Sequence, residues 1–174
     1  MKLASYKATR PGLHGIANVL IRIRLGGQYS HSEIVFMPGD GVDALMPDGT
    51  CEPVNGAYWC ASSVAAERLP AWSKRRPGRA GGVRFKRIQL DPDKWDLLDL
   101  QRDARQAARW FVENEGMPYD WQLILGFIAW FIHEDEGRVT CSEACASAGG
   151  HPDSWRFDPC ALAAAHTCVI PTAG

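Results

Sequence analysis

The sequence predicts a single α+β domain over residues 1–174, and three observations carry this prediction. Val83–Leu90 interleaves apolar with charged or polar side chains, which is typical of a strand with one buried face. Ser30–Met37 has strand composition and ends at the turn sequence Pro38–Gly41. After Asp91, apolar residues recur at helical spacing up to Phe111. We find no internal repeat and no second apolar core, so one domain is the economical interpretation.

Composition is that of an ordinary globular protein. The chain has 174 residues, 46% of them hydrophobic, and a formal net charge of -1. This charge gives no electrostatic reason to expect nucleic acid as a partner. The basic run Lys74–Arg79 contains Pro and Gly and is interpreted as a solvated loop. The sequence starts without the apolar core of a secretion signal, so we expect a cytoplasmic protein with reduced cysteines.

The remaining strands are assigned by composition and turn residues. Residues 16–25 alternate loosely and fit either a strand or a short amphipathic helix. Val42–Leu45 and Gly56–Val64 are predicted to be short strands. The region Arg68–Gly82, rich in Pro, Gly and cations, is predicted to be a long surface loop.

The second half is predicted to be mainly helical. Asp91-Pro92 offers an N-cap and a first-turn proline for a helix that Gly116 closes. Trp121–Ile132 is an apolar run of roughly a dozen residues, too short to span a bilayer, and is interpreted as a buried helix. A small-residue helix starts at Cys141 and stops at Gly149-Gly150. Phe157–His166 is predicted to form the last short helix.

The start of the small-residue helix places a thiol where a nucleophile is favoured. Cys141 would lie at the positive end of the helix dipole, which lowers the pKa of a thiol. The alternative is that Cys141 is one more small buried residue, which most free cysteines are.

A cysteine nucleophile needs a base, and His31 is the best placed of five histidines. It is the only one within a strongly strand-like segment, where a rigid backbone can aim the imidazole. On a strand, His31, Glu33 and Val35 share one face. The alternative is a hydrogen-bonded structural histidine.

Three short motifs resemble one known group of enzymes. Ser30–Phe36, Tyr119-Asp120-Trp121 and Cys141-Ser142-Glu143 look like the circularly permuted papain-like branch of the NlpC-type cysteine peptidase superfamily, including the YiiX-like proteins. In that branch the histidine strand precedes the cysteine helix, as it does here. Gly81–Arg84 and Asp158–Ala163 also look similar to small phage and prophage proteins of this group.

The resemblance implies a fold and a reaction. It implies a papain-like core in which the Cys141 helix packs across an antiparallel sheet carrying His31. It also implies that Cys141 attacks a carbonyl carbon while His31 acts as base and then as acid, without a cofactor. Amides of peptidoglycan peptides are the substrate class it suggests. Tyr119 would line the substrate cleft beside Cys141.

The residue that orients His31 has several candidates. The resemblance places it near Asp43, on the segment after the histidine strand. Glu33 competes on geometry, because it shares a strand face with His31, and Ser62 or Ser63 follow if Gly56–Val64 is the true next strand. Glu143, in the first helical turn, favours the helix dipole but opposes thiolate formation, so it is assigned to structure or substrate contact.

Three other functions compete with the hydrolase. A catalytically inert papain-like module, such as a phage structural component, would keep the fold without turnover. A lipid acyl hydrolase or transferase of the same fold would use the apolar Trp121–Ile132 segment. A zinc site would use cysteines and histidines near the C-terminus, but the sequence lacks the tight Cys-x2-Cys spacing of structural zinc sites. Its possible ligands are Cys141, Cys145, Cys160, His166 and Cys168.

Overall fold

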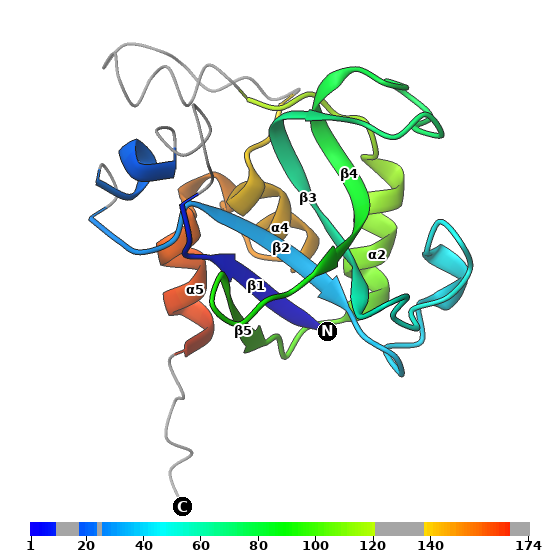
Figure 1. The fold of residues 1–174 in the computed structure, drawn as a ribbon, viewed down its shortest axis with the longest axis horizontal. Helices are drawn as coiled ribbons and strands as arrows, with labels where there is room; N and C mark the ends of the chain where they lie inside the picture. Colours follow the sequence, from blue (N-terminus) through cyan, green and yellow to red (C-terminus); the bar gives the residue numbers. More distant parts are fainter. Residues whose placement is uncertain (10–17, 24–25, 121–137, 168–174) are drawn as a thin grey trace, which may run out of the picture.

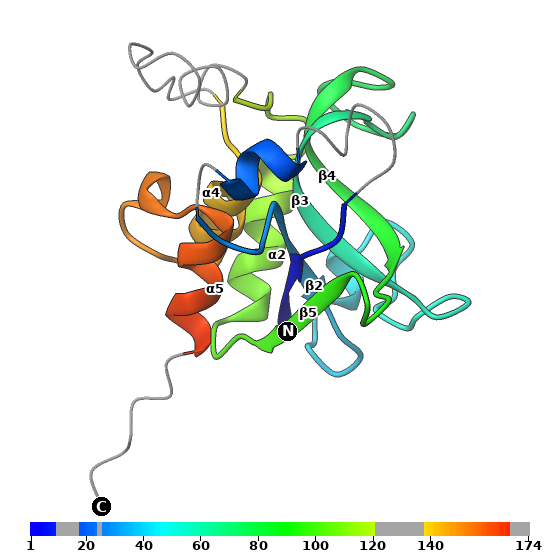
Figure 2. The same ribbon diagram turned by 60° about the vertical axis from the view of Figure 1, so that its left-hand side comes forward.

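The fold is an antiparallel sheet with helices packed on one of its faces (Figures 1 and 2). The computed structural model describes residues 1–9, 18–23, 26–120 and 138–167. Five strands pair in the order β4-β3-β2-β1-β5. They are β1 (Lys2–Tyr6), β2 (His31–Phe36), β3 (Ala57–Arg68), β4 (Ala80–Gln89) and β5 (Trp95–Asp99). The α+β class predicted from the sequence is therefore confirmed.

Strand β2 is the middle strand and is buried on both faces from Ser32 to Phe36. It pairs along its whole length with β1, from Tyr6↔His31 to Lys2↔Val35. Its pairing with β3 covers only Ile34–Phe36. The first three residues of β2 therefore have no ladder partner on the β3 side, which leaves room there for another element.

The helices fill the layer on one face of the sheet. They are α2 (Ala104–Glu113), α4 (Cys141–Ala148) and α5 (Pro159–Thr167), with the short 3-10 turns η1 (Asp43–Leu45) and η2 (Ser154–Arg156). Helix α4 packs on β2 and β3 and also contacts α2 and α5. Its buried side chains are only Cys, Ser and Ala, so its backbone can approach the sheet closely. The core between the layers includes Ile34, Phe36, Phe85 and Phe111.

The opposite face of the sheet carries a second, smaller apolar cluster. Its buried members are Ala4, Tyr6, Val35, Cys60 and Trp95. The rings of Tyr6 and Trp95 meet edge to face with their centroids 4.9 Å apart. Side chains alternate along a strand, so residues on the Val35 side of β2, including Glu33 and His31, belong to this face and not to the helix side.

The helix predicted to open at Asp91 is wrong in its first half. Residues Trp95–Asp99 form β5, paired with β1 in the register Lys2↔Asp99 to Tyr6↔Trp95. Lys7 and Asp96 also form an ion pair across this ladder at 2.6 Å. The helix itself begins later, at Ala104, where the Asp103 carboxylate accepts hydrogen bonds from the backbone N–H groups of Arg105 and Gln106. Sheet pairing with β1, a strand that was not predicted, overrides the local helical spacing.

Other predictions are confirmed or corrected by the backbone. The strands predicted over 30–37, 56–64 and 83–90 correspond to β2, β3 and β4, and the two C-terminal helices to α4 and α5. Val42–Leu45 is not a strand, because η1 occupies Asp43–Leu45. The predicted loop 68–82 is shorter, since β3 reaches Arg68 and β4 starts at Ala80. Residues 18–23 are helical, and the predicted helix 121–132 lies outside the described residues.

A close backbone approach at Gly82 guides the chain toward Cys141. A Cβ at Gly82 would lie 2.6 Å from the Met117 carbonyl oxygen, and its φ of +136 also favours glycine. Because Gly82 has no side chain, residues 116–117 can pair with Val83, whose N–H donates to the Met117 carbonyl at 2.9 Å. Tyr119 then bridges to Val139, two residues before Cys141. In the described ranges, no helix has the length and apolarity needed to cross a membrane.

Candidate active site

Cys141 is the first residue of α4, and a capping box fixes this end of the helix. The Thr140 hydroxyl accepts a hydrogen bond from the Glu143 N–H at 3.4 Å, while the Glu143 carboxylate accepts one from the Thr140 N–H at 3.2 Å. Glu143 thus has a structural role that the dipole argument favoured. The capping box does not use the Ser142 N–H, which donates to the Cys141 sulfur.

This cap gives a prediction about stability. We expect Thr140→Ala to lower the free energy of unfolding by about 1 kcal/mol, because one N–H at the helix start loses its acceptor. Urea unfolding followed by circular dichroism measures the change. Thr140→Ser keeps the hydroxyl and is the matched control, expected to stay close to the wild type. Equal stability of the alanine and serine variants would contradict the capping role.

The start of α4 lies where β2 and β3 are not paired. Side chains supply the hydrogen bonds in this gap: the Ser62 hydroxyl donates to the Ser32 carbonyl at 2.6 Å, and the Ser63 hydroxyl to the Val139 carbonyl at 2.8 Å. The Ser32 N–H donates to the Cys141 sulfur. Ser62 and Ser63 therefore tie the Cys141 segment and β2 to β3 and do not contact the His31 ring through any of these bonds.

His31, the first residue of β2, is a hydrogen-bond partner of Cys141. Its side chain is 12% exposed, and its Nε2 lies 2.8 Å from Oε1 of Glu33. Because Glu33 takes Nε2, Nδ1 is the nitrogen left for the Cys141 sulfur. The Trp95 ring lies edge-on to the imidazole, with centroids 6.3 Å apart. Two segments 110 positions apart in sequence thus meet at a sulfur and an imidazole.

Glu33 is held from the other side by a buried arginine. Arg84 Nη1 donates to Glu33 Oε2 at 2.7 Å, and Nη2 donates to Oε1 at 2.6 Å. The Glu33 and Arg84 side chains are 1% and 2% exposed. A bidentate pair with both oxygens engaged is the strongest geometry for such a contact. The structure therefore contains a continuous chain of polar contacts, Cys141–His31–Glu33–Arg84.

The charges along this chain shift the pKa of each member. Burial by itself raises the pKa of Glu33, but the Arg84 charge and the hydrogen bonds from His31 and Arg84 outweigh it and lower the pKa to about 2. Burial lowers the pKa of His31, yet the charges and hydrogen bonds of Cys141 and Glu33 raise it to about 9. Burial raises the pKa of the Cys141 thiol, but the charge and hydrogen bond of the His31 imidazolium and the N–H groups of Ser32 and Ser142 outweigh it, so the pKa is lowered overall. Thiolate and imidazolium thus stabilise each other.

The other residues singled out in the sequence lie in different positions. Asp43 follows the far end of β2, and its carboxylate accepts a hydrogen bond from the Cys51 N–H at 2.8 Å. The structure thus brings Glu33, and not Asp43, to His31. Tyr119 is buried near Cys141: burial and then the charges of Cys141, Asp120 and Glu143 raise the pKa of its hydroxyl well above the usual value.

The ligands considered for zinc are not gathered in the part of the structure that is described. No group of three or more His, Cys, Asp or Glu residues within residues 1–9, 18–23, 26–120 and 138–167 is placed to hold a metal ion. Cys145 is buried against Ser62 and Ile34, and the Cys160 thiol points at the Tyr29 carbonyl. Cys168 lies outside the described residues.

Comparisons with known proteins give no match. Models of protein families, curated proteins and solved structures were each searched without a significant hit.

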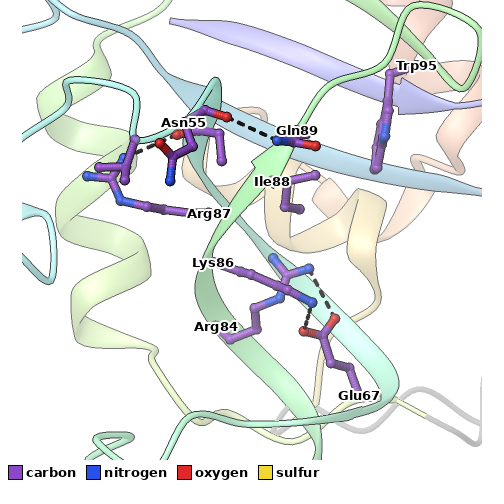
Figure 3. A pocket seen from close by; sticks show the side chains of 10 residues that line it. Asn55, Glu67, Arg84, Lys86, Arg87, Ile88, Gln89 and Trp95 are labelled. Atoms are coloured by element: carbon purple, nitrogen blue, oxygen red, sulfur yellow. Dashed lines mark hydrogen bonds and ion pairs between the residues drawn. The ribbon is translucent and has the colours of Figure 1, made fainter.

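A cavity of roughly 550 Å³ lies on the sheet face that carries Glu33 (Figure 3). Arg84 and Trp95 line it, and each of them also contacts a member of the polar chain. Glu67 pairs with Lys86 at 2.6 Å and lies 3.6 Å from Arg84, as the dashed lines of Figure 3 show. The charged side chains of this cavity therefore already have partners within the protein.

Sequence reasoning missed Arg84, although a signal for it was present. The alternation in Val83–Leu90 predicts a strand with its charged residues in solvent, which holds for Lys86 but not for Arg84. The signal lay in β2: Glu33 is a carboxylate within a strand that continues with the apolar residues Ile34, Val35 and Phe36. A buried carboxylate needs a cation or several donors, so a basic residue on a neighbouring strand was to be expected.

Proposed function

We propose that the protein is a cysteine hydrolase that forms a thioester at Cys141. The observation that carries this proposal is the contact between Cys141, at a helix start, and His31, whose ring is held by Glu33. Nucleophile, base and orienting group within hydrogen-bond reach are the general signature of covalent catalysis by cysteine. The order of histidine strand before cysteine helix supports a permuted papain-like topology for the domain.

The first half of the proposed reaction uses the ion pair as it stands. The Cys141 thiolate attacks the carbonyl carbon of an amide, a C–S bond forms, and the carbonyl oxygen takes the negative charge. Backbone N–H groups at the start of α4 point toward this region and favour that charge. The His31 imidazolium then gives its proton to the leaving nitrogen, the C–N bond breaks, and an amine departs.

The second half returns the enzyme to its starting state. Neutral His31 takes a proton from water, whose oxygen attacks the thioester carbonyl. Collapse of the intermediate breaks the C–S bond and releases a carboxylic acid, and the thiolate–imidazolium pair is restored. Glu33 holds the ring through Nε2 while Nδ1 exchanges the proton. No cofactor enters this sequence, and peptide amides such as those of peptidoglycan are the proposed substrates.

A pH profile of thiol labelling tests the central pair without knowledge of the substrate. We expect the rate at which iodoacetamide alkylates Cys141 to rise at a pH below the usual thiol pKa, as the thiolate forms (the low-pH step), and to change again near pH 9, where His31 loses its proton. In His31→Ala the low-pH step should disappear, leaving a single step near the free thiol pKa of about 8.5. Peptide mapping by mass spectrometry assigns the label to Cys141.

Two results would separate the proposal from an inert module. A wild-type Cys141 that reacts only near the free thiol pKa would favour a binding or structural protein that keeps this fold. A low-pH step that persists in His31→Ala would show that His31 does not supply the counter-charge. His151→Ala is the matched control: that ring pairs with His166 at 3.2 Å, away from Cys141, and its loss should leave the profile unchanged.

A further inference from the structure

Arg84 is an arginine almost fully withdrawn from water within a sheet. It lies on β4 opposite Ser62 of β3, and its side chain extends across β3 to Glu33 of β2. The register places Arg84 and Glu33 on the face of the sheet that carries the second apolar cluster, with Val35 and Cys60. Arg84 therefore does not contact Cys141 and reaches it only through two intervening side chains.

Glu33 is the main counter-charge of Arg84. Both terminal nitrogens of the guanidinium donate to the two oxygens of Glu33, at 2.7 and 2.6 Å. The other nearby carboxylate, Glu67, is farther away, at 3.6 Å, and is shared with Lys86. Arg84 Nε has no hydrogen-bond partner among the described residues. Both hydrogen bonds of the guanidinium to a carboxylate thus go to Glu33, and Glu33 also contacts His31.

The buried ion pair of Arg84 and Glu33 adjoins an apolar cluster. Cys60, which lies near Arg84, belongs to the second apolar cluster together with Val35. A pair of apolar residues would avoid the cost of removing two charges from water, and replacing buried ion pairs in this way often leaves proteins equally stable. An ion pair here has one evident consequence: Glu33 stays negative next to the imidazole.

We propose that Arg84 is a positioning residue, which keeps Glu33 ionised and aimed at His31 so that the Cys141–His31 ion pair forms at neutral pH. This inference rests on the proposed function and adds a fourth residue to its machinery. Without Arg84, a carboxyl group this deeply buried takes up a proton. A neutral Glu33 stabilises the imidazolium less, and a less stable imidazolium raises the pKa of Cys141.

The experiment compares the iodoacetamide profile of Cys141 in wild type and Arg84→Met. We expect the low-pH step to move up by at least one pH unit in the variant, which is about a tenfold lower labelling rate at any pH below the wild-type step. Arg84→Lys keeps the positive charge but loses the bidentate geometry, and we expect the low-pH step to shift less than in Arg84→Met. Arg87→Met is the matched control: Arg87 is on the same strand and pairs with Asp48 at 2.6 Å, away from Glu33.

A second comparison distinguishes positioning from a general structural role. If Arg84 acts only through Glu33, then Glu33→Gln and the double variant Glu33→Gln/Arg84→Met should give the same profile. A further shift in the double variant would contradict the inference. The double variant has no buried charge at this place, so it also carries the test if Arg84→Met alone does not fold.

The outcomes for this inference and for the proposed function differ. A wild type without a low-pH step contradicts the proposed function, and the inference falls with it. If the wild type shows the low-pH step and Arg84→Met shows it at the same pH, the role of Arg84 is contradicted while the proposed function stands. Three results together support the inference. The low-pH step shifts in Arg84→Met, it stays unchanged in Arg87→Met, and Glu33→Gln and Glu33→Gln/Arg84→Met give equal profiles.

Discussion

Cys141→Ala is expected to abolish acyl transfer while the fold persists. We expect the wild type to release a burst of p-nitrophenolate from p-nitrophenyl acetate, because the Cys141 thiolate takes the acetyl group faster than water removes it. The alanine variant has no nucleophile, so its rate should fall by on the order of 10⁴-fold or more, to that of the buffer. The same loss is expected with any peptide amide that the wild type hydrolyses.

The fold should tolerate this change. Cys141 is 6% exposed, and alanine fits in its place with the loss of one sulfur atom. We expect the free energy of unfolding to change by about 1 kcal/mol, because the site is small and lies at the end of the helix. An unchanged far-UV circular dichroism spectrum would show that the lost activity is not a loss of structure.

Cys160→Ala is the control for this experiment. Cys160 is the only one of the five cysteines in the described ranges that is partly exposed and not classed as buried, so it is the thiol most open to a chance reaction. Burial, as the largest cause, raises the pKa of its thiol, which keeps it protonated at pH 7. We expect Cys160→Ala to keep the full burst. A burst that survives in Cys141→Ala and disappears in Cys160→Ala would refute the mechanism.

The parts of the site that follow from local rules could be predicted from the sequence. The two-residue period of a strand places His31 and Glu33 on one face, and they are indeed 2.8 Å apart. Small residues after Thr140 predict a helix that starts at Cys141, and α4 starts there. Both are properties of short segments, so no knowledge of the rest of the chain was needed.

The parts that depend on pairing between distant segments could not be predicted. Residues 95–99 have helical spacing on their own and become β5 only because β1 offers a ladder partner. Arg84 looks like a solvent-facing residue of β4 until the register with β3 places it beside Glu33. Asp43 was a candidate by resemblance, but η1 and the Cys51 N–H hold it beyond the other end of β2.

Glu33→Gln is expected to cause a large loss of stability at pH 7. Glutamine keeps the shape of the side chain, and its oxygen can still accept a hydrogen bond from His31 Nε2. It cannot neutralise Arg84, whose guanidinium is 2% exposed. Removing one partner of a buried ion pair leaves an uncompensated charge, which typically costs about 3–5 kcal/mol. Urea unfolding at pH 7 measures the difference between variant and wild type.

The pH dependence of this difference has a definite sign. The pKa of Glu33 is lowered from 4.5 to about 2, so an unfolded chain binds a proton there between pH 4.5 and pH 2, where the folded protein does not. The ionised carboxylate therefore contributes stability above pH 4.5, and this contribution is lost progressively as the pH falls toward 2. Glutamine has no such titration. We expect the gap between wild type and Glu33→Gln to be widest near neutral pH and to narrow below pH 4.5.

Glu67→Gln provides the matched control, because Glu67 also pairs with a cation of β4 but is 26% exposed. An ion pair this close to solvent contributes about 1 kcal/mol or less, so the control should unfold almost as the wild type does at every pH. A Glu33→Gln variant as stable as Glu67→Gln would mean that Glu33 is neutral in the folded protein. In that case no negative charge would orient the His31 ring and favour its protonated form, and Cys141 would lack a stabilised imidazolium as its partner.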